Sequence, residues 1–237
     1  MSNRSPFIPP SDPSGHGGPV NPLPPVVVAL ALLLAGIELY FQAGSYGLLG
    51  QNGIGARVNA IQDFGFFDTV FEAMRLQGQW PLSHVMRFFT YAFVGGAMTQ
   101  TVFVIVFLLA LGNMVGRHFG QIAVVAIFAI STVAGSLAYG FLVNSEYPLI
   151  GGYPGVYGLI GGYTFMLYVG LGQLHQNQMR AFSLIGMLMG IQLLFGVIFG
   201  GTADWVADLA GFTAGLITAT LMVPGAFRRI LERIRKR

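Results

Sequence analysis

The sequence predicts an all-α protein, a polytopic membrane bundle of six transmembrane helices. Hydrophobic residues make up 54% of the 237 residues and charged residues only 9%, where a soluble domain has about 25% charged residues. A helix needs about 20 apolar residues to cross roughly 30 Å of hydrocarbon, and this chain has room for six such runs. The 34 glycines favour the same class, because helices in lipid bring their backbones together through small residues.

The chain begins with a segment that we expect to be a disordered cytoplasmic tail, residues 1–25. It is rich in Pro, Gly, Ser and Asn and has too little apolar surface to offset the cost of ordering. No signal-peptide pattern precedes the first apolar run, at 26–41, so this run should remain as a helix. Glu38 lies near its far end, where we expect the carboxylate to reach water; an ion pair with Arg87 is the alternative.

A long amphipathic loop should follow the first helix, over residues 43–90, because charged residues alternate there with phenylalanines. Trp80 and Pro81 fit an anchor at the membrane interface. The remaining apolar runs and residues 26–41 would form a membrane domain over residues 26–225. Residues 226–237 should form a basic amphipathic tail on the inner leaflet. The five further spans are expected near 93–115, 121–143, 155–172, 180–200 and 205–223.

The basic residues predict the orientation of the chain. Six of the twelve lie in the last ten positions. With alternate loops on alternate sides, nine basic residues fall on the side of the termini and three on the other. Positive charge marks the cytoplasmic side, so we expect both termini in the cytoplasm. The abundance of Gly and Phe, the absence of cysteine and the simple plan suggest a bacterial cytoplasmic membrane, with an organelle membrane as the alternative.

The composition also excludes several kinds of chemistry. There is no cysteine, so neither disulfides nor thiolate metal ligands are possible. The four histidines are scattered through tails and loops, in no spacing that suggests a metal site. We expect no cofactor, no metal and no nucleic-acid partner.

Glycine spacing predicts which helices pack closely. Glycines recur at intervals of three and four along the fourth predicted helix and four apart in the sixth, so we expect each set to form one face and the two faces to meet. These residues are Gly151, Gly155, Gly158, Gly162, Gly211 and Gly215.

Four segments resemble the rhomboid intramembrane serine proteases. Residues 86–93 (MRFFTYAF) are similar to the end of that family's first loop, where Arg87 would anchor the loop. Residues 112–120 (GNMVGRHFG) are similar to the turn after its second helix. Residues 152–158 (GYPGVYG) and 207–211 (ADLAG), with Gly215, are similar to its two catalytic segments. The resemblance implies a rhomboid-like fold over roughly residues 80–225.

The same resemblance implies that the catalytic dyad is lost. The nucleophile position falls on Pro154, or on Tyr153 in a register shifted by one residue, and the general-base position falls on Asp208. The family's oxyanion-binding positions fall on Gly95, Gln100 and Val104. A serine nucleophile needs a hydroxyl, a positioned base and oxyanion donors together, and most of these groups are missing.

An aspartate inside a membrane helix requires an explanation, because such a residue costs about 2.5–3.5 kcal/mol on insertion scales and is usually partnered. Asp208 would either be wetted near the outer surface beside Asp204 and Trp205, or accept a hydrogen bond from the hydroxyl of Tyr153 or Tyr157. A single carboxylate does not make an aspartic protease, which needs two.

The leading functional prediction is a rhomboid pseudoprotease that binds transmembrane segments of client proteins without cleaving them, in regulation, trafficking or quality control. The bilayer and these client segments would be its partners; the oligomeric state is left open. Two alternatives remain: an intramembrane protease with a non-standard catalytic site, and a channel, transporter or structural subunit of a membrane assembly.

Overall fold

The computed structural model describes residues 23–199 and 203–222. The predicted tails at 1–25 and 226–237 lie outside these residues, except that Leu23 and Pro24 lead into the first helix and Pro25 already belongs to it. Proline is well tolerated there, because the first helical position needs no amide donor. The main helices are α1 (Pro25–Ser45), α6 (Met98–Phe119), α7 (Gln121–Leu142), α8 (Tyr153–Gln173), α9 (Ser183–Phe199) and α10 (Trp205–Met222).

Five of these helices, all except α9, are long and apolar enough to span a membrane. Helix α9 has 17 residues, or about 26 Å at 1.5 Å per residue. Helices α8 and α10 run parallel, because Gly211 lies against Pro154 and Gly215 against Gly158, so α9 returns the chain between them. The count of six spans remains a prediction.

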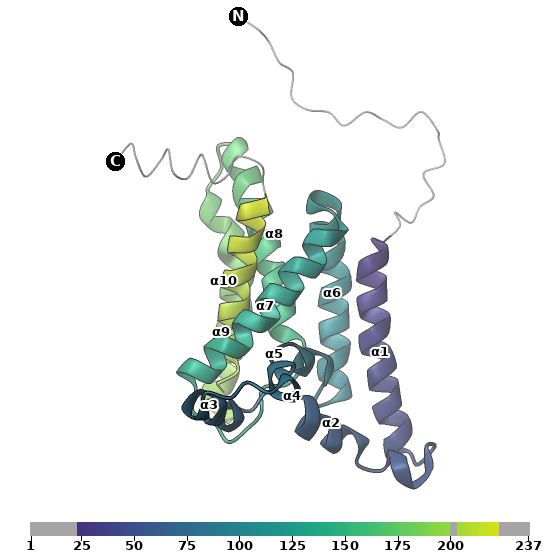
Figure 1. The fold of residues 1–237 in the computed structure, drawn as a ribbon. Coiled ribbons are helices and arrows are strands. Elements are labelled where there is room, and N and C mark those ends of the chain that lie inside the picture. Colours follow the sequence, from purple (N-terminus) through teal and green to yellow (C-terminus); the bar gives the residue numbers. More distant parts are fainter. Residues whose placement is uncertain (1–22, 200–202, 223–237) are drawn as a thin grey trace, which may run out of the picture.

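The segment between α1 and α6 folds into short helices at one end of the bundle (Figure 1). They are η1 (Gly50–Gly53), α2 (Ala56–Phe64), α3 (Asp68–Gln77), α4 (Leu82–Val85), α5 (Arg87–Thr90) and η2 (Tyr91–Phe93). We call residues 46–97 loop 1. Figure 1 also shows the Pro25 end of α1 and the Met222 end of α10 at the opposite end of the bundle.

Loop 1 packs on the bundle through a small aromatic core. Phe66 and Leu149 form an isolated antiparallel bridge, which joins loop 1 to the segment before α8. The rings of Phe66, Phe71 and Phe88 are nearly fully buried beside Tyr139 of α7. Aromatic pairs in this geometry add about 0.5–1.5 kcal/mol each beyond their buried area, so loop 1 has a defined position.

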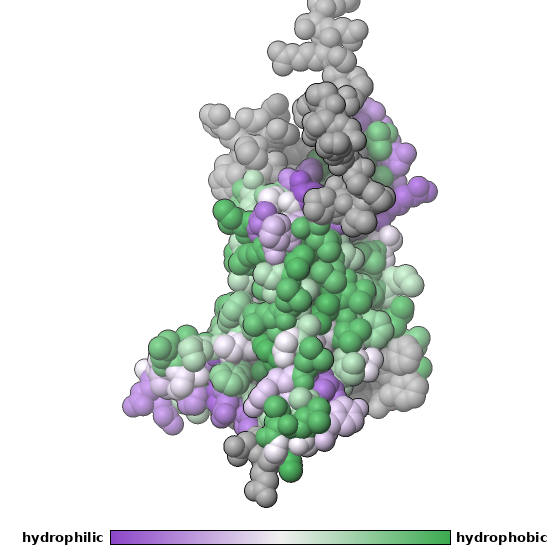
Figure 2. All heavy atoms as spheres, turned by 90° about the vertical axis from the view of Figure 1, so that its right-hand side faces the viewer, coloured by the Kyte–Doolittle hydropathy of each residue, from purple (hydrophilic) through white to green (hydrophobic). Residues whose placement is uncertain are grey.

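The outer surface has an apolar band between two polar ends. Figure 2 views the molecule from the side of α1 and shows the band as green atoms between purple ones. Leu32 and Leu39 of α1 belong to this surface, and each is 66% exposed. Apolar residues in contact with lipid chains explain such exposure in a polytopic membrane protein.

Candidate functional site

The close contact between α8 and α10 positions the site. A Cβ atom on Gly211 or Gly215 would overlap the carbonyl of Pro154 or Gly158, respectively. The absence of side chains at these two glycines therefore lets the α10 backbone approach the start of α8. Because of this approach, Gly211 and Gly215 of α10 lie beside the first two turns of α8.

The predicted single glycine face on α8 is corrected in two respects. Gly151 lies before the helix, with φ of +88°, a left-handed conformation that favours glycine. Gly155 faces Phe128 of α7, whereas Gly162 lies against Ile127 of α7 and, less closely, against Ala219 of α10, so these two glycines do not share one face toward α10. Gly161, which the spacing argument omitted, lies against the backbone of α10.

A cavity of about 340 Å³ lies among α6, α8, α9 and α10. Tyr153 and Asp208, two of the three positions that the rhomboid resemblance assigns to the lost dyad, both line it. The third, Pro154, is buried instead against Gly135 of α7. The structure therefore brings Tyr153, and not Pro154, into one cavity with Asp208.

Asp208 and the tyrosines are linked through a residue that the sequence reading missed. The Gln192 side chain of α9 donates a hydrogen bond from Nε2 to Asp208 Oδ2 at 2.8 Å. Its Oε1 accepts a hydrogen bond from the Tyr157 hydroxyl at 3.2 Å. Asp208 is only 2% exposed, so it is not the wetted surface residue of the first reading. The second reading placed the tyrosine hydroxyl directly on Asp208; in the structure, Gln192 instead bridges Tyr157 and Asp208.

The three positions assigned to the oxyanion donors lie together, but elsewhere. Gly95, Gln100 and Val104 line a void of about 10 Å³ that also touches α1. Gln100 accepts a hydrogen bond from the Gly96 amide at 2.7 Å, and its amide donates to the Ile150 carbonyl at 3.4 Å. Gln100 thus links loop 1 to the segment before α8 through these two hydrogen bonds.

Glu38 neither reaches water nor pairs with Arg87, so both readings of its role are wrong. It is 6% exposed and forms an ion pair with Arg57 of α2 at 2.6 Å. Thr101 of α6 donates a further hydrogen bond to it at 2.9 Å. Arg57 also donates to the Gly95 carbonyl at 2.6 Å. These contacts join α1, loop 1 and α6.

Arg87, the expected anchor of loop 1, contacts the backbone of that loop, and its anchoring role remains a prediction. Its Nη1 donates to the Gly65 carbonyl at 3.1 Å, and its guanidinium lies 5.9 Å from the centre of the Phe67 ring. Nearby, the Tyr91 hydroxyl donates to the Thr132 carbonyl at 2.8 Å. Burial, with a smaller effect from Asp208, raises the pKa of Tyr91 well above its usual value, so its hydroxyl keeps its proton.

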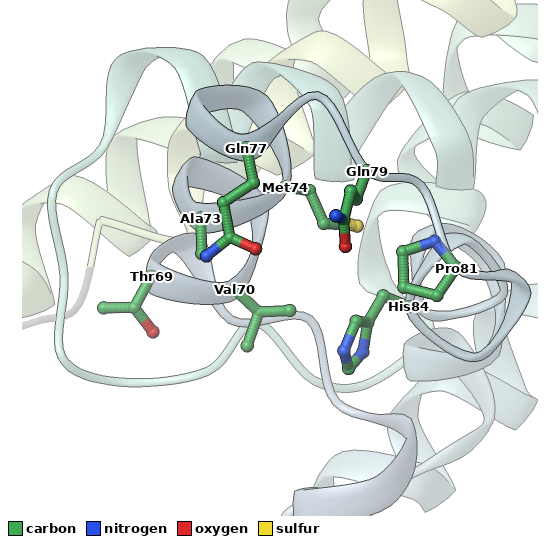
Figure 3. A pocket seen from close by; sticks show the side chains of 8 residues that line it. All are labelled: Thr69, Val70, Ala73, Met74, Gln77, Gln79, Pro81 and His84. Carbon is green, nitrogen blue, oxygen red and sulfur yellow. The ribbon is translucent and has the colours of Figure 1, made fainter.

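A second cavity, of about 380 Å³, lies within loop 1. Figure 3 shows Thr69, Val70 and Ala73 of α3 on one side of it and Pro81 and His84 on the other. Neither Tyr153 nor Asp208 lines this cavity, so it is separate from the positions of the lost dyad.

The arrangement around Asp208 lacks the parts of a serine dyad. None of the residues that line the cavity is a serine or a histidine. Of the four histidines, His84 lies in loop 1, His118 at the end of α6 and His175 just after α8, and His16 lies outside the described residues. Within the described part of the chain, no group of three His, Cys, Asp or Glu residues could hold a metal ion.

The fold and the site define a class: a polytopic helical membrane protein whose first loop is packed on the bundle and whose helices α6, α8, α9 and α10 surround a cavity. The family model of the Rhomboid domain matches residues 82–225. The chain belongs to the rhomboid family. No curated protein matches the chain.

Proposed function

We propose that this protein is a catalytically inactive rhomboid that binds transmembrane segments of other membrane proteins. One observation carries the proposal: the cavity that Tyr153 and Asp208 line has mainly apolar walls, and Gln192 links Tyr157 to Asp208 across it by hydrogen bonds. Two positions that the resemblance assigns to the dyad line this cavity, but no serine or histidine does.

The loss of chemistry follows from what the dyad requires. A serine attacks as an imidazole takes its proton, and removing either member eliminates nearly all of the rate advantage. Tyr153 and Asp208 supply neither the serine nor the imidazole of that dyad, and the Asp208 carboxyl accepts its hydrogen bond from Gln192. We propose that Gly95, Gln100 and Val104 mark the lost oxyanion donors.

The cavity is suited to an apolar helix or an unwound segment of one. Phe103 and Phe107 of α6 and Leu188 and Ile191 of α9 line it. Phe103 is 52% and Ile191 43% exposed, so the cavity opens onto the surface that faces lipid. A client segment that diffuses in the bilayer can therefore enter sideways, between α6 and α9.

The proposal includes a topology. Both termini lie in the cytoplasm of a bacterial cell, the tails at 1–25 and 226–237 flank a membrane domain at 26–225, and loop 1 lies on the outer side. The excess of basic residues on the side of the termini supports this orientation. The cavity then opens toward the outer half of the bilayer.

Cleavage and capture are measured in the same membranes. The wild-type protein is expressed with transmembrane substrates of active rhomboids, and with a photo-reactive phenylalanine analogue at Phe103 or at Leu188. The matched control carries the analogue at Leu32, which lies on α1 and is 66% exposed. We expect no cleavage, and crosslinks to transmembrane proteins from Phe103 and Leu188 that are absent from Leu32.

The alternative of a protease with a non-standard site gives the opposite result. Cleavage by the wild type that is abolished in Asp208→Asn would overturn the proposal and make that carboxyl catalytic. Equal crosslinking from all three positions would also contradict it, because it would indicate contact with neighbours in the bilayer at random. A Tyr153→Ser, Asp208→His variant follows from the geometry as the revertant to test, since Tyr153 is the residue that shares the cavity with Asp208.

A further inference from the structure

Asp208 is a buried acidic residue whose carboxyl accepts a hydrogen bond from an amide. It is 2% exposed at the wall of the cavity, and Gln192 donates to it at 2.8 Å. None of the side chains that line the cavity is basic. Acidic residues within membrane helices usually pair with a cation or with several donors, so a single amide satisfies this carboxyl incompletely.

The rest of the chain has few basic residues that could form an ion pair with Asp208. The sequence has no lysine or arginine between Arg117 and Arg180, or between Arg180 and Arg228. The arginines of loop 1 have other contacts. Arg57 pairs with Glu38, Arg75 lies over the ring of Phe141, and Arg87 donates to the Gly65 carbonyl.

We propose that the cavity selects client segments that carry a lysine or arginine about one turn inside their outer end. This inference rests on the proposed function and names the class of client. The basic group of the client takes the place of the Gln192 amide on Asp208, while Gln192 keeps its bond from Tyr157. Charge complementarity, and not shape alone, then determines which segment stays.

The depth of Asp208 determines where the basic residue must be. Asp208 is the fourth residue of α10, so it lies about 5 Å along the helix axis from the first residue. A lysine at this depth enters the membrane at low cost, because its chain can extend toward the headgroups. Its aliphatic stem would lie along Phe103 and Phe107, which line the same cavity as Asp208.

Designed client segments test the proposal in full-length protein in membranes. Three segments of leucine and alanine differ at one residue, one turn inside the outer end: lysine, methionine or glutamate. Capture is measured by photo-crosslinking from Leu188. We expect the lysine segment to crosslink about tenfold more than the methionine segment, and the glutamate segment less than either. A fourth segment, with its lysine at the opposite end, should behave like the methionine segment.

Variants of the protein assign the selectivity to one carboxyl. Asp208→Asn should reduce the ratio of lysine to methionine capture to about one, with methionine capture unchanged. Asp208→Glu keeps the charge and should keep a ratio above one. Glu146→Gln, which removes an exposed acid from the loop before α8, is the matched control and should leave the tenfold ratio intact.

The outcomes separate this inference from the function on which it rests. Equal capture of the lysine and methionine segments by the wild type would overturn the inference and leave client binding in place. A lysine preference that persists in Asp208→Asn would also overturn it, because the selectivity would then lie elsewhere. Capture of none of the segments would overturn both.

Discussion

At the scale of single residues, removing one member of the buried ion pair of Glu38 and Arg57 should strongly lower the stability of the protein. Its carboxylate lies inside the bundle and accepts hydrogen bonds from Arg57, Thr101 and Gln42. Arg57 lies 19 residues after Glu38 in the sequence, beyond the turn into loop 1. A buried pair of this kind contributes little net stability, but loss of one member leaves an uncompensated charge.

Arg57→Met should therefore lower the free energy of unfolding by about 3–5 kcal/mol. The reason is that Glu38 keeps its charge and loses its cation, and the Gly95 carbonyl loses a donor. Unfolding of the purified protein in mixed micelles measures the effect. The double variant Glu38→Leu, Arg57→Met should recover most of the loss, because no charge is left unpaired.

Arg75→Ala is the control for this pair. Arg75 is an exposed arginine of the same loop, and its guanidinium lies 5.7 Å from the centre of the Phe141 ring. Exposed cation–π contacts are worth about 0.5–1 kcal/mol, so this variant should remain close to the wild type. A loss as large as that of Arg57→Met would contradict the special role of the ion pair.

The sequence indicated which residues of the site carry charge, but not which residues they contact. Asp208 was identified from its position inside an apolar helix, and Gln192 could have been found by the same signal, since it is a lone polar residue in the apolar run of α9. The partner of Glu38 could not be predicted from the sequence, because the distance between α1 and α2 depends on how loop 1 folds back. Hydrophobic periodicity contains no information about that path.

At the scale of helices, the bundle depends most on the contact of α8 with α10. The predicted spans agree with the helices in order and approximate position, because apolar length determines them. The predicted glycine face was less accurate. The spacing of three and four residues continues past the start of α8 to Gly151, which lies two residues before the helix. Spacing alone does not reveal where a helix begins.

Gly215→Ala should destabilise the protein by about 1–3 kcal/mol, the usual cost of forcing an extra methyl group into a packed contact. A Cβ there would overlap the Gly158 carbonyl, so α10 would have to move away from α8. Thermal unfolding in micelles gives the change, and crosslinking from Leu188 reports whether the cavity survives.

Gly186→Ala and Gly190→Ala in α9 are the matched controls. A Cβ at either position meets no atom within 4 Å, and alanine is about 1 kcal/mol better than glycine in a helix. Both variants should be neutral or slightly more stable. Destabilisation equal to that of Gly215→Ala would show that the effect comes from glycine loss in general and not from the α8–α10 contact.

At the scale of the whole molecule, the absence of cysteine makes the topology directly testable. Tyr46→Cys lies at the end of α1 beside loop 1, and Leu174→Cys lies just after α8; both positions are well exposed. A maleimide that cannot cross membranes should label Tyr46→Cys in intact cells with a permeabilised outer envelope. Leu174→Cys should be labelled only after the inner membrane is disrupted.

The cysteine-free parent is the control for background labelling in this experiment. Labelling of both cysteines from the same side would contradict the three crossings, α6, α7 and α8, that lie between them. Labelling of Leu174→Cys alone in intact cells would reverse the proposed orientation. The membrane class and family could be predicted from composition and short motifs; the sidedness rests on charge counts and needs this measurement.

The parallel contact of α8 with α10 also bears on how the protein is made. Pro154 and Gly158 enter the membrane well before Gly211 and Gly215, which cover them in the finished protein. At roughly 5–20 residues per second, several seconds of translation separate the two events. During this interval the newly inserted α8 lacks its principal neighbour, so the ribosome must complete α10 before the protein can acquire its final packing.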